Sequence, residues 1–436
     1  MKLDLQKFYQ ACNPSKTLAV ENAEDQQYYI DFASVRGGRI IEELRDNITF
    51  FSPDEPTCEL FTGHIGCGKS TELLRLKAEL EQAGFHVVYF ESSQDLEMSD
   101  VDIGDILLAI ARRVAESLDS LEKQLKIPEP KGLRKIIEGA AKLVQVEIEW
   151  SAEFTLGIGK ITAKVKNSPE LRNKLREYLG PRTKSILDVI NEELIESATD
   201  KLKQHNKKGL VVIVDNLDRL DISQKPWGRP QPEYIFVDRG EQLRQLKCHV
   251  VYTIPLSLRF SNDIERLTQR FMVDPKVLPM VPAQQRNGFI CEEGMYLLKQ
   301  MVLARAFPYV PETERLNLIS QIFDQPQTFE RLCLVSGGHV RELLRLLYDW
   351  IKKQRKLPLE REILESVVRY RCNQMALAIT DDEWELLRQV AKNHRVNGDE
   401  GYRSLIHSRF VYEYCDRNGF WFGINPMLAE APGLKL

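Results

Sequence analysis

The sequence predicts an α/β protein that is built on a parallel β-sheet and continues into a helical region and a small helical domain with a hairpin. Five short apolar runs with strand character alternate with helix-like connections, the pattern of a parallel sheet covered by helices. The run at 209–214 is apolar throughout, as expected for a strand buried on both faces. The part after residue 285 has helical periodicity and ends in an Asn418-Gly419 turn between aromatic residues, a strong hairpin signal.

Composition places the chain among folded, water-soluble proteins. At 436 residues it is long enough for two or three domains, and 43% hydrophobic with 28% charged residues is ordinary for such chains. Its apolar runs are far shorter than the roughly 20 residues that a membrane helix needs, and its N-terminus lacks the apolar segment of a signal peptide. We therefore expect a cytoplasmic protein with no membrane partner.

Cysteines and net charge exclude some classes of function. The eight cysteines are scattered without a C-x-x-C pair, which argues against both a zinc site and a disulfide framework. The net charge of −4 supplies no overall signature of a nucleic-acid-binding protein.

The predicted sheet follows a polar N-terminal segment, residues 1–30, and a tight glycine turn at Arg36-Gly37-Gly38. A helix is predicted over 69–83, because Leu73, Leu76 and Leu80 fall on one of its faces. The strands are predicted, in chain order, at 58–61, 86–90, 209–214, 249–253 and 277–281.

The segment at 122–205 is predicted to be an insertion in this sheet. A long helix up to about residue 204 is expected in its second half, after a helix start with Ser168 as N-cap and Pro169 in the first turn. In its first half, apolar residues alternate with polar ones, which predicts short strands or a hairpin. The alternating residues are Val144, Val146 and Ile148, then Phe154, Leu156 and Ile158.

The C-terminal part is predicted to be a winged helix-turn-helix. Residues 286–356 are helical, and the basic run at 352–356 is either a solvated linker or a nucleic-acid patch. After it we expect three helices, the last over 402–412, and then a hairpin turning at Asn418-Gly419. Three helices followed by a hairpin is the element order of a winged helix.

A phosphate-binding pattern, G-x-x-x-x-G-K-[ST], lies between the first strand and the next helix. Glycines let backbone N–H groups curl around phosphate oxygens, and the positive end of the helix dipole points at the same place. In this pattern the lysine reaches the β- and γ-phosphates and the hydroxyl residue ligates Mg²⁺. A glycine-rich turn with a coincidental Lys-Ser is the alternative, which the flanking strand and helix disfavour. The residues are Gly63, His64, Ile65, Gly66, Cys67, Gly68, Lys69, Ser70 and Thr71.

Together these residues and motifs resemble the AAA+ and STAND classes of P-loop ATPases, including their initiator-like and KAP-like branches. The resemblance covers about 31–436, and it makes 63–71 the Walker A motif and 211–218 the Walker B motif. It implies ATP and Mg²⁺ as cofactors and a sheet with strand order 5-1-4-3-2. The implied domains are an ATPase core at 31–285, a helical lid at 286–357 and a winged helix at 358–436.

The Walker B match departs from the usual AAA+ form, which ends in Asp-Glu. By the resemblance, Asp215 associates with Mg²⁺ together with Ser70. Asn216 stands where the glutamate would activate water, and an amide cannot act as a base. Asp218 resembles the distal acid of STAND and KAP proteins and is the candidate base or water-positioning residue; a helix cap or surface acid is the alternative. A slow switch therefore fits better than a fast motor.

The resemblance implies further roles at four places. Thr253 resembles the sensor-1 residue that touches the γ-phosphate, and Arg341 resembles the sensor-2 arginine of the lid. Arg270, with Arg266 before it, lies where such families place an arginine finger for a neighbouring subunit. Exposed helix arginines are common, so a plain surface role is the favoured alternative for this pair. The turn at Arg36 and Gly37 resembles the linker that meets adenine.

Three functions follow as hypotheses. The leading one is an ATP-dependent switch that couples nucleotide state to a protein client or to self-association in a ring or dimer, in signalling or defence. The second is a DNA-loaded ATPase that uses 358–436 on duplex DNA; residues 365–436 contain nine basic and ten acidic residues, which favours protein contact instead. The third is a nucleotide-binding scaffold without turnover, suggested by Asn216.

Overall fold

The computed structural model describes residues 3–119, 130–147 and 154–434. The chain forms two compact units and passes between them several times. The first unit contains Met1–Ile40, Gly63–Arg75 and Val277–Leu436, and the second contains Ile41–Thr62 and Leu76–Lys276. Among the described residues, no helix combines the length and the apolar character needed to cross a bilayer.

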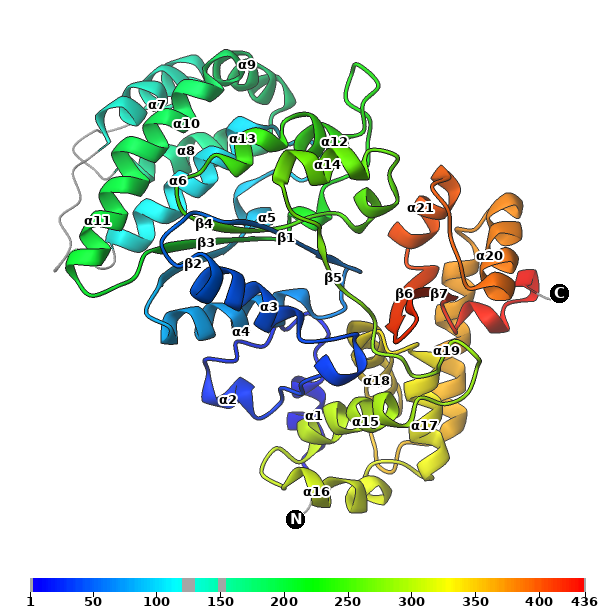
Figure 1. Ribbon diagram of the computed structural model, residues 1–436. Coiled ribbons are helices and arrows are strands. Elements are labelled where there is room, and N and C mark those ends of the chain that lie inside the picture. The colour runs from blue at the N-terminus through cyan, green and yellow to red at the C-terminus, as the bar shows by residue number, and fades with distance from the viewer. Residues whose placement is uncertain (1–2, 120–129, 148–153, 435–436) are drawn as a thin grey trace. The chain divides into compact units, whose positions relative to one another are not determined.

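A five-stranded sheet is the centre of the second unit (Figure 1). Its order, β2-β3-β4-β1-β5, confirms the expected order read from the other edge. Neighbouring strands among β1 to β4 run parallel. The strands are β1 (Cys58–Gly63), β2 (His86–Glu91), β3 (Leu210–Asp215), β4 (His249–Thr253) and β5 (Lys276–Leu278).

The register of these strands brings their carboxyl ends to one edge. Every residue of β1 and of β3 is buried, as expected for parallel strands covered on both faces. Phe61 lies opposite Thr253, and Val214 lies opposite Tyr252. The strands β1, β3 and β4 therefore end level with one another, the arrangement in which α/β sheets bind ligands.

Helices α6 to α11 and α13 lie together over one face of the sheet (Figure 1). They bury one continuous apolar core with the strands, in which Ile106, Ile110 and Val114 of α6 are fully inaccessible. The helices of this unit are α3 (Ile40–Asp46), α5 (Ser92–Asp95), α6 (Ile103–Asp119), α7 (Lys131–Leu143), α8 (Phe154–Lys166), α9 (Pro169–Leu179), α10 (Thr183–Val189), α11 (Ser197–Gln204), α12 (Gln231–Glu233), α13 (Gly240–Arg244) and α14 (Ile264–Phe271).

The short strands or hairpin predicted in the insertion are wrong. Val144 caps the end of α7, and the residues from Phe154 onward begin α8. Ile158, Ile161 and Val165 of α8 are buried, and their spacing is that of one helix face. The alternating run was too short to distinguish the two-residue period of a strand from the 3.6-residue period of a helix. Ile148, which belonged to the same prediction, lies outside the described residues.

The predictions for the second half of the insertion are confirmed. Ser168 is the N-cap of α9, and its side chain accepts a hydrogen bond from the N–H of Leu171. A 3₁₀ turn at Gly180–Arg182 interrupts the helical path, which then continues through a π-helical stretch, Ile190–Glu196, to the end of α11 at Gln204.

The first unit is mainly helical. Its N-terminal helix packs on α15 and α18, where the rings of Tyr9 and Tyr348 stack with centroids 4.0 Å apart. Phe323, Phe329 and Trp350 form an aromatic cluster among the helices of 286–357. The helices are α1 (Leu5–Ala11), α2 (Ala23–Gln26), the start of α4 (Lys69–Gln82), α15 (Glu292–Ala306), α16 (Glu312–Arg315), α17 (Pro326–Val335) and α18 (Val340–Gln354).

The C-terminal part of this unit has three helices and a hairpin. These are α19 (Arg361–Ala376), α20 (Asp381–Asn393), α21 (Glu400–His407), β6 (Val411–Asp416) and β7 (Gly419–Ile424). The hairpin is confirmed, with Asp416 paired to Gly419 across the turn. The helix predicted over 402–412 ends earlier, at His407, because Val411 already belongs to β6. The element order is that of a winged helix, and that identification stays a prediction.

Candidate functional site

The glycine-rich turn occupies the expected position between a strand and a helix. β1 ends at Gly63 and α4 begins at Lys69, so Ser70 and Thr71 lie in the first helical turn. The Lys69 ammonium is almost completely buried, and its Nζ donates to the carbonyls of Gly63, at 2.8 Å, and His64, at 2.9 Å. The lysine side chain is thus tied to the backbone at the start of the turn.

Two glycines in the turn are required by its backbone. Gly66 has φ +93° and Gly68 has φ +110°, conformations that side chains other than glycine rarely adopt. A Cβ atom at Gly66 would also lie 2.6 Å from Cε1 of His339. Both glycines therefore serve the curl of the turn, and Gly66 also permits its close contact with another helix.

Helix α18 contacts the turn through its first residues. His339 caps the helix, because its Nδ1 accepts from the N–H of Glu342 at 3.1 Å, while Nε2 lies 3.0 Å from the carbonyl of Ile65. Nε2 therefore carries the proton and donates it to that carbonyl. Burial lowers the pKa of His339 to about 4, so the ring is neutral near pH 7.

Arg341, the expected sensor, also lies against the turn. Its backbone N–H donates to the carbonyl of Gly66 at 3.2 Å, and its Cβ would be 3.0 Å from a Cβ placed on that glycine. The structure thus brings Arg341 and the turn together within one unit.

Arg36 contacts the turn from the N-terminal side. Its Nη2 donates to the carbonyl of Cys67 at 2.7 Å, and its guanidinium lies 5.1 Å from the ring centre of Phe32. The side chain is buried, and this burial lowers the pKa of its guanidinium. Gly37, with φ +80°, packs so tightly on Cys415 that a Cβ would lie 2.7 Å from its Sγ. Both predicted linker residues therefore support the turn and the hairpin next to it.

A contact that sequence reasoning missed joins the turn to the C-terminal hairpin. The N–H of Glu413, in β6, donates to Nε2 of His64 at 2.9 Å. The ring of Tyr412 lies 5.8 Å from the ring of His64 and 5.5 Å from that of His339. Burial lowers the pKa of His64 well below its usual value, and the acceptor role of Nε2 likewise requires a neutral ring. Nothing local in the sequence could indicate a pair 349 residues apart.

In the second unit, the predicted acid stands at the end of β3. Asp215 is 1% exposed; Oδ2 accepts from the hydroxyl of Tyr89 at 2.8 Å, and Oδ1 accepts from the N–H of Asn216 at 2.6 Å. Asn216 adopts φ +66°, which asparagine tolerates better than most residues, and its Nδ2 donates to Oγ of Ser93 at 3.3 Å. The asparagine therefore has a conformational role directly after the acid.

Thr253 and Asp218 belong to the same turn as Asp215. The Thr253 hydroxyl donates to the carbonyl of Val214 at 3.3 Å and accepts from the N–H of Leu217 at 3.0 Å. Asp218 is buried in the 3₁₀ turn Leu217–Arg219. The structure thus brings these three predicted residues together, and the threonine hydroxyl joins β4 to the acidic turn.

The two arginines considered as fingers lie on α14 and are exposed. Arg266 is 51% exposed and pairs with Asp263 at 2.9 Å, and Arg270 is 41% exposed and pairs with Glu241 at 3.3 Å. Exposed pairs of this kind contribute little energy and can be exchanged readily. Both guanidiniums are therefore accessible for contact with another molecule.

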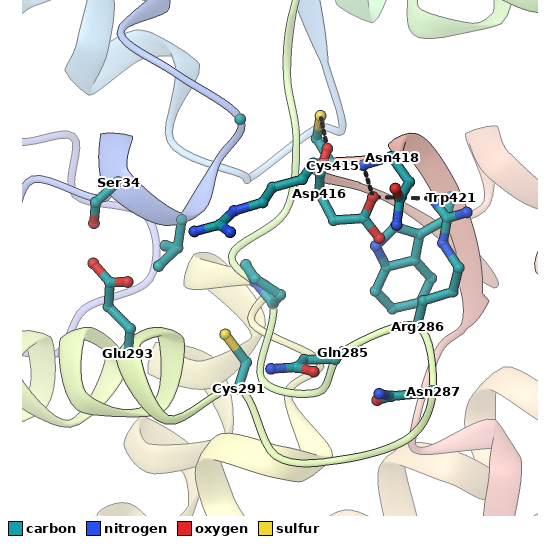
Figure 2. Close-up of a pocket in the computed structure, with 14 residues that line it drawn as sticks. Ser34, Gln285, Arg286, Asn287, Cys291, Glu293, Cys415, Asp416, Asn418 and Trp421 are labelled. Carbon is teal, nitrogen blue, oxygen red and sulfur yellow. Dashed lines mark hydrogen bonds and ion pairs between the residues drawn. The ribbon is translucent and has the colours of Figure 1, made fainter.

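A pocket of about 890 Å³ opens in the first unit, next to Gly37 (Figure 2). In Figure 2, Ser34 and Glu293 lie at one end, and Asp416, Asn418 and Trp421 of the hairpin lie at the other. Its wall includes an ion pair between Arg286 and Asp416 at 3.2 Å, which leaves little net charge there.

Comparison with known proteins supports a P-loop domain. Residues 39–225 match the KAP family P-loop domain, a range that contains both the turn at 63–71 and Asp215. The P-loop class expected from the motifs is thereby confirmed. No curated protein matches this chain.

Several solved structures are similar at low identity. The structure of the Aeropyrum pernix ORC2 protein in ADPNP-ADP complexes has 12% identity and a TM-score of 0.42, over 96% of this chain and 93% of that chain. Drosophila ORC bound to DNA has 11% identity and a TM-score of 0.35, over 100% and 92%. CDC6P from Pyrobaculum aerophilum has 11% identity and a TM-score of 0.35, over 94% and 96%.

Proposed function

We propose that this protein is an ATP-binding switch that hydrolyses ATP slowly and changes its contacts with a partner as it does so. The observation that carries the proposal is the turn at 63–71, whose two left-handed glycines and buried Lys69 form a phosphate-binding cradle directly after a buried strand. The match of 39–225 to a P-loop domain supports the same conclusion.

Binding would use the donors that converge on the turn. Backbone N–H groups of the turn would hold the phosphates, and Lys69 would exchange its bonds to the carbonyls of Gly63 and His64 for charge-assisted bonds to phosphate oxygens. Arg341 would add positive charge from α18. The differential affinity of these groups for ATP and ADP is what could shift the conformation of the protein.

Mg²⁺ fits the oxygen donors that the chain offers. Mg²⁺ is usually bound by one or two protein oxygens together with substrate phosphates, and the Ser70 hydroxyl and the Asp215 carboxylate are ligands of this kind. An ion held by either group would neutralise phosphate charge. Tyr89, which donates to Oδ2 of Asp215, would keep that carboxylate oriented.

Slow turnover follows from the residue after Asp215. The amide of Asn216 cannot accept a proton from water, and its side chain is already bonded to Ser93. Asp218 would then be the base or the group that positions water. Thr253 would act by holding the acidic turn in place, since its hydroxyl is bonded to Leu217 and Val214.

Equilibrium binding and steady-state phosphate release test this function. We expect the wild-type protein to bind ATP with Mg²⁺ and to release phosphate slowly, and the Lys69→Ala variant to bind ATP at least ~10-fold more weakly and to release no phosphate. No binding by the wild type, or equal binding by Lys69→Ala, would reject the proposal. Tight ATP retention with no release would instead support a scaffold without turnover.

Two further experiments address partners. Native mass measurement with and without ATP and Mg²⁺ tests self-association; assembly that needs ATP and is lost in Arg270→Ala would support an arginine finger. A gel shift with duplex DNA tests the second candidate, which rests on the helix-helix-helix-hairpin order of 361–424. Binding that is absent or insensitive to salt would reject the DNA hypothesis.

A further inference from the structure

A one-turn helix, α5, follows β2 directly and lies next to the acidic turn, residues 215–219. The last residue of β2, Glu91, lies opposite Asp215, so α5 begins level with the acid at the end of β3. The hydroxyl of Ser93, in α5, accepts from Nδ2 of Asn216 at 3.3 Å. The position of α5 is therefore linked to the position of the backbone directly after Asp215.

Helix α8 of the insertion also holds α5. Nζ of Lys166 donates to the carbonyl of Ser93 at 3.1 Å and to that of Gln94 at 3.4 Å. A helix leaves its last carbonyls without partners inside the helix, and a lysine near them is favourable. Asp95, which is 4% exposed, pairs with Arg113 of α6 at 2.8 Å. Two longer helices thus fix the short helix that contacts Asn216.

A second link joins the insertion to the chain beyond the acidic turn. Asp100, in the connection between α5 and α6, pairs with Arg176 of α9 at 2.6 Å. The same carboxylate pairs at 3.0 Å with Lys225, a buried lysine in the connection that follows the acidic turn. The segment 92–102 is therefore bonded on one side to the insertion and on the other to the acidic turn and the chain after it.

We propose that Lys166 is a positioning residue for ATP hydrolysis, which acts through Ser93 and Asn216 to keep the acidic turn in place. Lys166 fixes α5, and α5 holds the side chain of Asn216, whose left-handed backbone (φ +66°) leads into the turn that contains Asp218. The proposal rests on the proposed hydrolytic function. It gives the insertion at 122–205 a part in setting the rate of that reaction.

The effect of Lys166 falls on turnover and not on binding. A base must lie within hydrogen-bond reach of the water that it activates, and a displacement of about 1 Å can lower a rate by about 100-fold. The contacts of Lys166 lead to the acidic turn and not to the phosphate-binding turn at 63–71. A loosened α5 should therefore lower kcat and leave the affinity for ATP almost unchanged.

The decisive variant is Lys166→Met, which keeps the unbranched apolar stem and removes the ammonium. We expect kcat for phosphate release to fall at least ~5-fold and KM to stay within about 2-fold, because a hydrogen bond from a charged group is lost away from the phosphates. Lys166→Arg, which restores a cationic donor, should recover much of the rate. The matched control is Lys164→Met, at an exposed position of the same helix, which should change neither constant.

Ser93→Ala tests the path from α8 to the acidic turn. The variant removes the hydroxyl that accepts from Asn216 and should lower kcat by ~3-fold or more. Because Ser93 and Lys166 act through the same short helix, the double variant should be about as slow as the slower single variant. Ser99→Ala, at an exposed position of the same connection, should leave kcat unchanged. Single effects that multiply in the double variant overturn the proposed path.

Hydrogen exchange of the nucleotide-free protein gives a readout that does not depend on turnover. The N–H of Leu217 donates to the hydroxyl of Thr253 at 3.0 Å and reports on the acidic turn. It should exchange faster in Lys166→Met than in the wild type, and at the wild-type rate in Lys164→Met. Unchanged exchange at Leu217 in Lys166→Met overturns the proposal.

Steady-state phosphate release with ATP and Mg²⁺, together with melting temperatures, completes the experiment. An unchanged kcat in Lys166→Met, or a rise in KM alone, overturns the proposal. A lower melting temperature with a loss of rate that Lys166→Arg does not restore assigns Lys166 a structural role only, which also overturns it. A wild-type protein that releases no phosphate refutes the proposed hydrolytic function, and this inference with it. An active wild type with an equally active Lys166→Met refutes this inference alone.

Discussion

Glu413 donates its backbone N–H to Nε2 of His64 at 2.9 Å. His64 is the first residue after Gly63 in the phosphate-binding turn, and Glu413 lies in β6, the first strand of the C-terminal hairpin. If the turn rearranges around phosphate, either the hairpin moves with it and this bond is kept, or the bond breaks. Since a buried backbone donor without an acceptor is costly, we expect the position of the hairpin to respond to any rearrangement of the turn.

We expect Lys69→Ala to weaken ATP binding by at least ~10-fold, because hydrogen bonds to charged groups contribute about 1.5–3 kcal/mol. Titration calorimetry with ATP and Mg²⁺ measures the effect. The control is Lys77→Ala, which removes a lysine of the same helix that pairs with Glu81. An affinity within about 2-fold of the wild type would contradict the role given to Lys69.

Arg36→Ala should lower both stability and ATP affinity. The variant leaves the carbonyl of Cys67 without the donor that holds it, and a buried polar group without its partner costs about 1–3 kcal/mol. Urea denaturation and ATP titration are the measurements. Arg39→Ala, which removes an exposed arginine three residues later, should change neither quantity. If both variants behave alike, Arg36 does not support the turn.

Asp218→Asn should spare ATP binding and reduce phosphate release by a factor of at least ~100, the usual contribution of a general base. The substitution keeps the size of the side chain, so a buried 3₁₀ turn should tolerate it. Binding and release are measured in parallel, with Asp221→Asn at an exposed position as the control. Loss of binding in Asp218→Asn would show that the carboxylate supports the site structurally.

Acid should destabilise the protein partly through His339. Its pKa is about 4 when folded, because it is buried, and near 6.5 in an unfolded chain. Between these two pH values the unfolded chain binds the proton and the folded protein does not, so the free energy of unfolding falls as pH falls through this window. Above pH 6.5 the group has no effect. The total contribution is about 3 kcal/mol.

Urea denaturation at several pH values between 7 and 4 tests this dependence. His339→Gln should flatten the curve without abolishing its slope, because burial lowers the pKa of His64 in the same direction. His205→Gln, at an exposed histidine, should leave the slope unchanged. An identical slope in the wild type and His339→Gln would contradict the buried, neutral state of His339.

Much of the fold was predictable because the relevant signals are local. Apolar runs such as 210–214 indicate buried strands wherever they occur, and the two glycines at 66 and 68 indicate a backbone that only glycine adopts easily. The Asn418-Gly419 turn likewise identified the hairpin. Prediction was wrong in the insertion. Apolar and polar residues alternate over a few positions at the start of α8, as they do in a strand, but this segment is a helix.

By itself, the sequence predicted the phosphate-binding chemistry of the turn at 63–71 and the acid at the end of β3, because both depend on neighbouring residues. The order of the strands was implied by the resemblance to P-loop ATPases. Only the tertiary structure decided which distant groups support that chemistry. Arg36 holds Cys67, Arg341 lies on Gly66, and Glu413 binds His64. These pairs form because packing brings together segments that are far apart in the chain. The periodicity of the sequence does not indicate which buried donor will bond to which acceptor.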